Sequence, residues 1–340
     1  MSTWPERLEE LTSAPSGWGA KARQQLRHLP GGYALRHRLR MLRFAYLAHA
    51  LGDHVYWEPG LELGPFPGRR VATVYDLSHL TAPESHPAPR VAYLQHQVDR
   101  TLRHANHIVT ISQTMRREIA AYAGLREADI SVVPPAADAS FKPLSADALP
   151  EVRARLGLPE HYILSVGTLE PRKNLLRLAQ AYEGLPANLR RRWPLVCVGG
   201  QGWNDTSLIR GLRRLEARGE LIRLGYVAQR ELPLITAAAD LLAYPSLYEG
   251  FGMPVVEAMA CGVPVLTSRG TAMQEITGDA AFLVDPQDEV AIREVIYTAL
   301  ESHGLRARFA AEGPVRAARY NWDVSTVALL EALRGESMSA

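Results

Sequence analysis

The chain has 340 residues and a formal net charge of +2, and 47% of its residues are hydrophobic. This length predicts two domains of ordinary size, and so small a charge gives no indication of nucleic-acid binding. No apolar run approaches the roughly 20 residues of a membrane-spanning helix, and the polar, acidic first residues are not typical of a signal peptide. Cys197 and Cys261 lie in apolar runs outside any CxxC motif, which predicts buried free thiols in a reducing compartment. A cytoplasmic two-domain protein is expected.

A basic segment precedes the first predicted strand. Residues 11–52 contain no Asp or Glu, and residues 21–43 place cations among leucines and aromatic residues: Lys21, Arg23, Arg27, Arg36, Arg38, Arg40 and Arg43. This pattern is typical of a helix on an anionic membrane surface, which would bring the protein to the inner face of the cell membrane. A surface helix with one solvated and one buried face fits equally well, and both interpretations stay open.

Short apolar runs alternate with helical segments along the chain. In the first half, strands are predicted over 53–59, 69–76, 106–112 and 130–135, and helices over 89–105 and 113–125. A Pro-rich and polar stretch, 141–159, is interpreted as a linker. In the second half, strands are predicted over 161–167, 194–200, 221–227, 240–246, 263–268 and 280–285, separated by helices over 174–185, 205–219, 231–239 and 288–302. The alternation predicts an α/β protein with two parallel sheets, each covered by helices on both faces.

In doubly wound sheets, ligands bind at the carboxyl ends of the strands, so the loops that follow strands deserve inspection. The loop GTLEPRKN (167–174) places Arg172 and Lys173 at the start of a helix. Cations at a helix N-terminus are slightly unfavourable, but a phosphate group there would reverse the sign of the interaction. We therefore favour an anion site over a solvated turn with incidental charges.

A second loop, SLYEGFGMPVVEAMACGVPVLTS (246–268), contains two acids. Pro254 and Gly262 predict a helix of about two turns between them, with Glu257 just inside it and Glu249 in the preceding loop. Gly250 and Gly252 leave nearby backbone N–H groups open to a ligand. Because a carboxylate can accept hydrogen bonds from two hydroxyls, a sugar or a ribose diol is a natural partner. An acid that stabilises a helix N-terminus beside a flexible loop is the alternative.

Other ligand classes are not supported. The segment VGGQGWND (198–205) lacks the third glycine of a dinucleotide-binding GxGxxG motif, and there is no Walker A sequence. The histidines are scattered without metal-ligand spacing, so no catalytic metal is expected.

Several segments resemble retaining GT-B glycosyltransferases of family 4. The stretch 246–268 resembles their Glu-x7-Glu signature, and SVGTLEPRKNLLRLAQAY (165–182) resembles the diphosphate-binding segment of the mannosyltransferase-like branch. The segments 225–246 and 278–286 are similar to the stretches around that signature, and 319–333 is similar to the last helix, which crosses back to the N-terminal domain. The resemblance spans roughly residues 70–333 and is more specific in the second half.

This resemblance implies the GT-B fold: two Rossmann-like doubly wound domains that face each other across a cleft. The expected parts are an acceptor-side domain (1–143), a linker (144–159), a nucleotide-sugar-binding domain (160–318) and a crossing helix (319–335). Relatives open with an apolar strand and a glycine-rich turn, which the first 30 residues here do not show.

The resemblance also implies roles for residues. Glu249 would face the donor hexose and Glu257 the nucleotide ribose, while Arg172 and Lys173 would neutralise the departing diphosphate without a metal. The backbone of four loop residues would hold sugar hydroxyls, and three residues after a strand would line the base pocket: Gly250, Phe251, Gly252 and Met253, and Gly225, Tyr226 and Val227. The departing phosphate oxygen would take the proton of the acceptor.

The chain departs from the family where relatives usually read His-Asp-Leu, because it has Tyr75-Asp76-Leu77. Tyr75 and Asp76 are candidates for the sugar pocket or the acceptor site, and His79 lies four residues beyond Tyr75. The expected function is transfer of mannose or a deoxyhexose, from a GDP-sugar more than a UDP-sugar, to a glycan or lipid-linked saccharide in surface polysaccharide or lipopolysaccharide synthesis. The alternatives are a catalytically silent subunit that binds nucleotide-sugar and, more distantly, a sugar-nucleotide epimerase.

Overall fold

The structure is a computed structural model that describes residues 41–200, 202 and 206–335. The chain divides into two compact units, Met1–Tyr56 with Gly64–Arg69, and Trp57–Leu63 with Arg70–Ala340. In the smaller unit, residues 41–48 are helical and are followed by η2 (His49–Leu51). Most of the predicted basic segment and all of the first 30 residues lie outside the described part of the chain.

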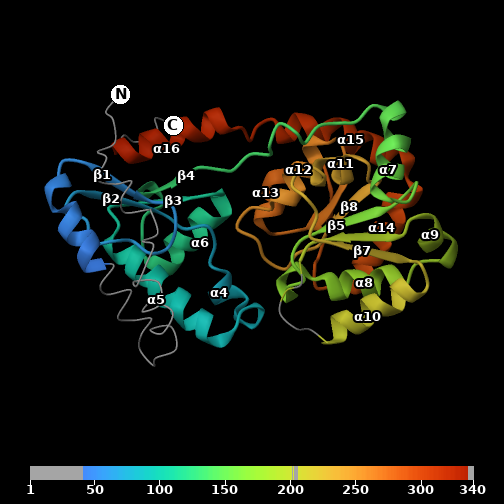
Figure 1. Ribbon diagram of the computed structural model, residues 1–340, viewed down its shortest axis with the longest axis horizontal. Coiled ribbons are helices and arrows are strands. Elements are labelled where there is room, and N and C mark those ends of the chain that lie inside the picture. Colours follow the sequence, from blue (N-terminus) through green and yellow to red (C-terminus); the bar gives the residue numbers. More distant parts are fainter. Residues whose placement is uncertain (1–40, 201, 203–205, 336–340) are drawn as a thin grey trace, which may run out of the picture. The chain divides into compact units, whose positions relative to one another are not determined.

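The first sheet has four strands in the order β1-β2-β3-β4: β1 (Val55–Glu58), β2 (Arg69–Thr73), β3 (His107–Thr110) and β4 (Ile130–Val132) (Figure 1). Strands β2, β3 and β4 are parallel, with Val71 opposite His107 and Ile108 opposite Ile130. The sheet is accompanied by α4 (Ser78–Thr81), η3 (Pro83–Ser85), α5 (Ala88–His104), α6 (Gln113–Ala123) and η4 (Glu127–Asp129). The four strands and two long helices predicted here are confirmed.

The second sheet has six strands in the order β10-β9-β8-β5-β6-β7, and every neighbouring pair is parallel. The strands are β5 (Ile163–Val166), β6 (Leu195–Val198), β7 (Leu221–Gly225), β8 (Leu241–Tyr244), β9 (Val265–Ser268) and β10 (Phe282–Val284). The chain runs outward from β5 through β6 to β7, then returns to the other side of β5 with β8. The carboxyl ends of β5 and β8 therefore form the topological switch point, where doubly wound sheets bind ligands.

Both faces of this sheet are buried, because successive side chains of a strand point to opposite faces. Ile163 of β5 belongs to one apolar cluster with Leu178, whereas its neighbour Leu164 belongs to another with Val256. The helices of this half are α8 (Leu175–Glu183), α9 (Ala187–Arg192), α10 (Thr206–Ala217), α11 (Leu232–Ala237), α12 (Met253–Ala260), α13 (Ala272–Thr277), α14 (Glu289–Glu301) and α15 (His303–Ala317).

Five α-helices were missed by sequence reasoning: α4, α7, α9, α13 and α15. Helix α15 contains Pro314 and Gly313, which weaken a helical pattern. It forms because Gly313 lets it approach α12, where an added Cβ would meet Met259 O at 3.1 Å.

The segment interpreted as a linker contains η5 (Ala146–Ala148) and helix α7 (Leu149–Leu156). Val152 is buried, and Arg153 donates to Ala238 O at 2.9 Å. Tertiary contacts therefore stabilise a helix in a stretch that its Pro and polar content had led us to interpret as a linker.

The last helix, α16 (Trp322–Arg334), returns to the first sheet, as predicted for the crossing helix. Its Ala332 packs with Val71 of β2 and Val109 of β3, and Ser325 Oγ donates to Pro134 O just beyond β4. Among the described residues, no helix has the length and apolar character needed to cross a membrane.

Candidate functional site

The predicted anion loop follows β5 at the switch point. Its last turn is η6 (Pro171–Lys173), which ends at Asn174, a non-glycine residue with a φ of 60°. Such a conformation is uncommon outside glycine, although Asn tolerates it better than most residues. The Asn174 side chain compensates by donating to Pro245 O at 2.9 Å and to Pro286 O at 2.7 Å. Asn174 thus ties the loop after β5 to the end of β8, a role that sequence reasoning missed.

Glu249, in the loop after β8, is the centre of the site. Its carboxylate accepts from Arg172 Nη1 and Lys173 Nζ, both at 2.6 Å. It also accepts from Tyr244 Oη at 2.7 Å and from Ser246 Oγ at 2.8 Å. The structure therefore brings together the two predicted cations and the first predicted acid, and adds Tyr244 and Ser246 to them.

The charges of this cluster follow from its contacts. Burial acts to raise the pKa of Glu249, but Lys173 and Arg172 outweigh burial and hold that pKa below its ordinary value. Burial, followed by the charge of Glu249, raises the pKa of Tyr244 well above 10. The phenol therefore stays protonated at neutral pH and donates to an ionised carboxylate. Arg172 Nε also forms an ion pair with Glu170 Oε2 at 3.3 Å, so two carboxylates face the two cations of the cluster.

The glycine loop between Glu249 and α12 has little freedom. A Cβ on Gly250 would lie 2.2 Å from Tyr75 O, and Gly252 has a φ of +122°. Phe251 is buried and packs edge-on against Tyr320, with ring centroids 5.3 Å apart. Within the described chain, the backbone N–H groups of Phe251, Gly252 and Met253 have no hydrogen-bond acceptor. These donors remain available to a ligand at the start of α12.

Glu257 has a different environment from Glu249. It lies in α12, which begins with Pro254 near its first position and is followed by Gly262 with a φ of +70°, as predicted. No described residue forms an ion pair or hydrogen bond with the Glu257 carboxyl group. Burial alone raises the pKa of Glu257 from 4.5 to about 7. The Glu249 carboxylate thus accepts hydrogen bonds from four side chains, whereas the Glu257 carboxyl group has no hydrogen-bond or ion-pair partner among the described residues.

A cavity of about 510 Å³ adjoins the cluster. It is lined by Lys173, Glu249 and the predicted loop residues Gly250, Phe251, Gly252 and Met253, and by Tyr75 and Asp76. Trp57 and Trp322 also line it, and sequence reasoning missed both. Glu257 and the predicted base-pocket residues do not line this cavity. Gly225 has a φ of +67° and accepts from Gly199 N at 2.8 Å, Tyr226 is 87% exposed, and Val227 is partly buried.

Tyr75 and Asp76 follow β2 of the first sheet. Tyr75 is 47% exposed, and burial, aided by Glu58, raises its pKa, so the phenol stays protonated at neutral pH. Asp76 Oδ1 accepts from Ser78 N at 2.9 Å. Tyr248, next to Glu249, accepts from Leu77 N at 3.1 Å and donates to a carboxylate oxygen of α6. The strand ends of the two sheets therefore meet at this site.

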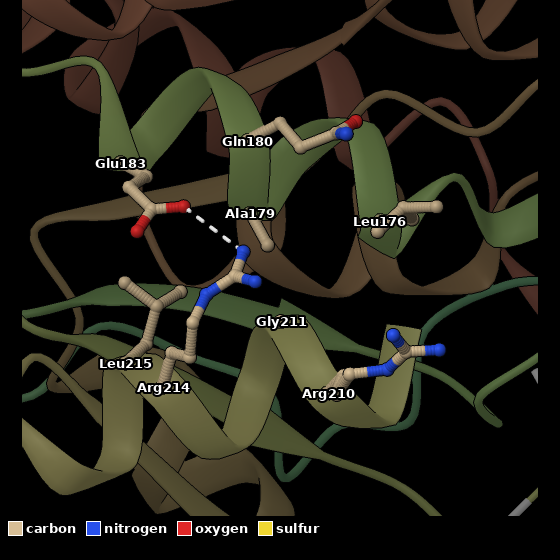
Figure 2. Close-up of a pocket in the computed structure, with 8 residues that line it drawn as sticks. All are labelled: Leu176, Ala179, Gln180, Glu183, Arg210, Gly211, Arg214 and Leu215. Carbon is tan, nitrogen blue, oxygen red and sulfur yellow. Dashed lines mark ion pairs between the residues drawn. The ribbon is translucent and has the colours of Figure 1, made fainter. Parts of the chain in front are cut away.

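A separate hollow of about 240 Å³ lies between α8 and α10 (Figure 2). Arg214 reaches Glu183 across it at 3.5 Å, and Arg210 lies on its rim. None of the predicted donor-site residues lines this hollow. No group of His, Cys, Asp and Glu in the described ranges is arranged to hold a metal ion.

Comparisons with known proteins identify the family. Residues 150–316 match the model of "Glycosyl transferases group 1", and residues 2–141 match that of "Glycosyltransferase Family 4". The O-antigen chain mannosyltransferase B of Escherichia coli is 36% identical over 86% of this chain and 77% of that protein. This chain belongs to the family 4 glycosyltransferases.

Two further comparisons place this glycosyltransferase among its relatives. The serotype-specific mannosyltransferase WbdA of Escherichia coli is 31% identical over 64% of this chain, which spans only 27% of that longer protein. The crystal structure of Anabaena HepE in complex with UDP and glucose superimposes with a TM-score of 0.66 at 22% identity, over 78% of this chain and 72% of HepE. With its two parallel α/β sheets and crossing helix, the glycosyltransferase has the predicted GT-B fold.

Proposed function

We propose that this glycosyltransferase moves a hexose, mannose or a related deoxyhexose, from a nucleotide diphosphate sugar to a saccharide acceptor. The observation that carries the proposal is the cluster of Arg172, Lys173 and Glu249 at the switch point, beside the open N–H groups of the glycine loop. Two cations suit a diphosphate, and a carboxylate with free N–H groups suits sugar hydroxyls. The similarity to the O-antigen chain mannosyltransferase supports mannose and polysaccharide synthesis.

The donor would extend across the carboxyl ends of the second sheet. Its diphosphate would lie against Arg172 and Lys173, and its hexose would face Glu249 and the N–H groups of 250–253. Glu257 would accept hydrogen bonds from the two ribose hydroxyls, since no described residue forms a hydrogen bond or ion pair with that carboxyl group. The backbone of 225–227 would line the base pocket. A guanine base is favoured through the mannosyltransferase relatives, although HepE was crystallised with UDP.

The proposed reaction retains the configuration at the sugar carbon. The C–O bond between the hexose and the diphosphate breaks as the acceptor oxygen bonds to the same face of the sugar carbon. The departing phosphate oxygen takes the acceptor's proton. Glu249 is unsuited to act as a base because four donors hold its carboxylate ionised. Arg172 and Lys173 stabilise the negative charge that develops on the diphosphate, so no metal ion is required.

The acceptor is proposed to be a glycan or a lipid-linked saccharide. The basic segment 21–43 would bring the enzyme to an anionic membrane surface on the cytoplasmic side, and its described end, Arg43, lies in the helix 41–48. Salt-sensitive sedimentation with vesicles that contain anionic lipid would support this contact, and equal binding to neutral vesicles would reject it.

The decisive experiment is a panel of GDP- and UDP-linked hexoses, with sugar release and sugar transfer measured separately in the presence of EDTA. NMR of the product determines the anomeric configuration of the new linkage. Lys173→Met should abolish transfer, whereas the exposed Lys142→Met serves as a matched control. A wild-type protein that binds nucleotide but transfers no sugar would favour the silent-subunit alternative. An inverted product would reject the retaining mechanism.

A further inference from the structure

A second, smaller cavity adjoins the donor site on the side of the first sheet. Its volume is about 230 Å³, below the roughly 300–1,000 Å³ of pockets for drug-sized ligands, so one sugar ring is a suitable occupant. The cavity lies around α4 and the start of α5, and Tyr75 and Asp76 line both it and the larger cavity. Arg172 also lines it while holding Glu249. A ligand here would lie beside the predicted position of the donor diphosphate.

His79 is the unusual residue of this cavity. Its side chain lines the cavity and is only 2% exposed, and its Nε2 has no hydrogen-bond partner in the described part of the chain. Buried polar atoms are nearly always paired, and an unpaired one costs about 1–3 kcal/mol. Burial lowers the pKa of His79, so the imidazole is neutral at pH 7 and offers one donor and one acceptor. A ligand hydroxyl in the cavity would satisfy Nε2.

The other polar groups of the cavity also suit hydroxyls better than an anion. Ser78 Oγ is hydrogen-bonded to His86 Nε2 at 3.0 Å, and burial, followed by Arg90, lowers the pKa of His86. Two carboxylates, of Asp76 and Glu170, and two guanidinium groups, of Arg90 and Arg172, line the same space, so their charges balance and do not select an anion. The cavity therefore contains both donors and acceptors of hydrogen bonds, among them neutral imidazoles, a serine hydroxyl and carboxylates. An uncharged sugar ring needs both kinds of partner, because each of its hydroxyls donates and accepts.

We propose that this cavity binds the terminal, uncharged hexose of the acceptor, and that His79 and the Ser78–His86 pair form hydrogen bonds with its hydroxyl groups. The inference rests on the proposed transferase function and narrows its acceptor to the end of an existing saccharide, as opposed to a lipid phosphate. The acceptor hydroxyl would then lie near Arg172, on the side where the departing phosphate oxygen takes its proton.

The first test measures acceptor use by the full-length enzyme. Methyl glycosides of mannose, glucose, galactose and rhamnose serve as probes, with polyprenyl phosphate as the anionic comparison. His79→Asn and Ser78→Ala should each raise the KM for the best methyl glycoside by about 5- to 10-fold, the effect of one neutral hydrogen bond. Nucleotide affinity, measured by calorimetry, should stay within about twofold. His96→Ala, on the exposed side of α5, is the matched histidine control and should leave both unchanged.

The second test requires no donor. Saturation-transfer NMR should detect the methyl glycoside on the wild-type enzyme and on His96→Ala, and should lose most of the signal on His79→Asn and Ser78→Ala. Unchanged KM values and unchanged NMR signals in His79→Asn and Ser78→Ala would overturn the proposal, as would transfer to polyprenyl phosphate alone. Either result would leave nucleotide binding and the proposed donor chemistry standing. Loss of nucleotide binding by Lys173→Met without any sugar transfer by the wild type would instead count against the proposed function.

Discussion

Replacing Glu257 by Gln should stabilise the unliganded enzyme at high pH and weaken its nucleotide binding. The carboxyl group lies in α12 without a counter-charge among the described residues, and burial raises its pKa from 4.5 to about 7. In the unfolded chain the same group ionises near 4.5. Above pH 7 the folded protein therefore carries a partly desolvated negative charge, and unfolding would return that charge to water.

The size and sign of the effect follow from this difference. Between pH 4.5 and 7 the folded state binds the proton that the unfolded state releases, so this group lowers the free energy of unfolding as the pH rises. The full cost, reached above pH 7, is about 3 kcal/mol for a shift of this size. Gln has no charge to bury, so Glu257→Gln should gain about 3 kcal/mol at pH 8 and less than about 1 kcal/mol at pH 5.

Urea denaturation of both proteins at the two pH values measures this difference. The exposed Glu160→Gln provides the control and should change little at either pH. A gain for Glu257→Gln that is equal at pH 5 and pH 8 would refute the reasoning, because an uncharged effect such as packing would then explain it.

The nucleotide should respond in the opposite direction. If ribose hydroxyls donate to an ionised Glu257, GDP affinity of the wild type should rise as the pH increases toward 7 and then level off. Glu257→Gln should bind GDP at least about tenfold more weakly at pH 8, since charge-assisted hydrogen bonds are worth about 1.5–3 kcal/mol, and should lose the pH dependence. Calorimetry from pH 6 to 8 checks both points.

Three further changes test the donor site. Tyr75→Phe should cost about 0.5–1.5 kcal/mol of transition-state stabilisation, measured as kcat/KM, because one neutral hydrogen bond is lost, and Tyr75→His should remain active. Gly250→Ala should lower the transfer rate at least about tenfold, because the added Cβ would lie 2.2 Å from Tyr75 O. Gly304→Ala, whose Cβ would meet no neighbouring atom, should leave the rate unchanged. A fully active Gly250→Ala would show that the loop can move freely. Glu249→Gln should lower kcat by about 100-fold or more yet keep or strengthen GDP binding, since it removes a negative charge beside Arg172 and Lys173. Equal losses of GDP affinity in Glu249→Gln and Glu257→Gln would reject the separate roles of the two acids.

Much of the fold could be predicted because its signals are local. The runs around Ile163 and Leu164 are apolar on both faces, which only a doubly covered parallel strand requires. Ser112 and Gly124 mark the ends of α6 through a side-chain cap and a left-handed stop. Helices α7 and α15 escaped prediction because contacts with α11 and α12, distant in the sequence, stabilise them.

The candidate site was predictable in its residues but not in its pairing. The sequence pattern indicated Arg172, Lys173 and Glu249, because cations before a helix and an acid beside glycines are unusual. It offered no sign that Tyr244 and Ser246 also bind this carboxylate, since Tyr and Ser residues at or just beyond the end of a strand commonly pack without chemistry. From the sequence, His79 was noticed only because it lies four residues beyond Tyr75. The burial of its Nε2 without a hydrogen-bond partner depends on the packing of α4.

The contrast between the two acids has a consequence for catalysis. Before the donor binds, Glu249 holds Arg172 and Lys173 in place, so neither side chain must be reordered from solvent when the diphosphate arrives. Arg172 and Lys173, which already face the carboxylates of Glu170 and Glu249, then meet the diphosphate of the intact donor. When the glycosidic bond breaks, the diphosphate gains a further negative charge while the cations stay where they are. Their attraction therefore grows most at the transition state, which is the condition for raising kcat and not merely tightening the binding of the donor.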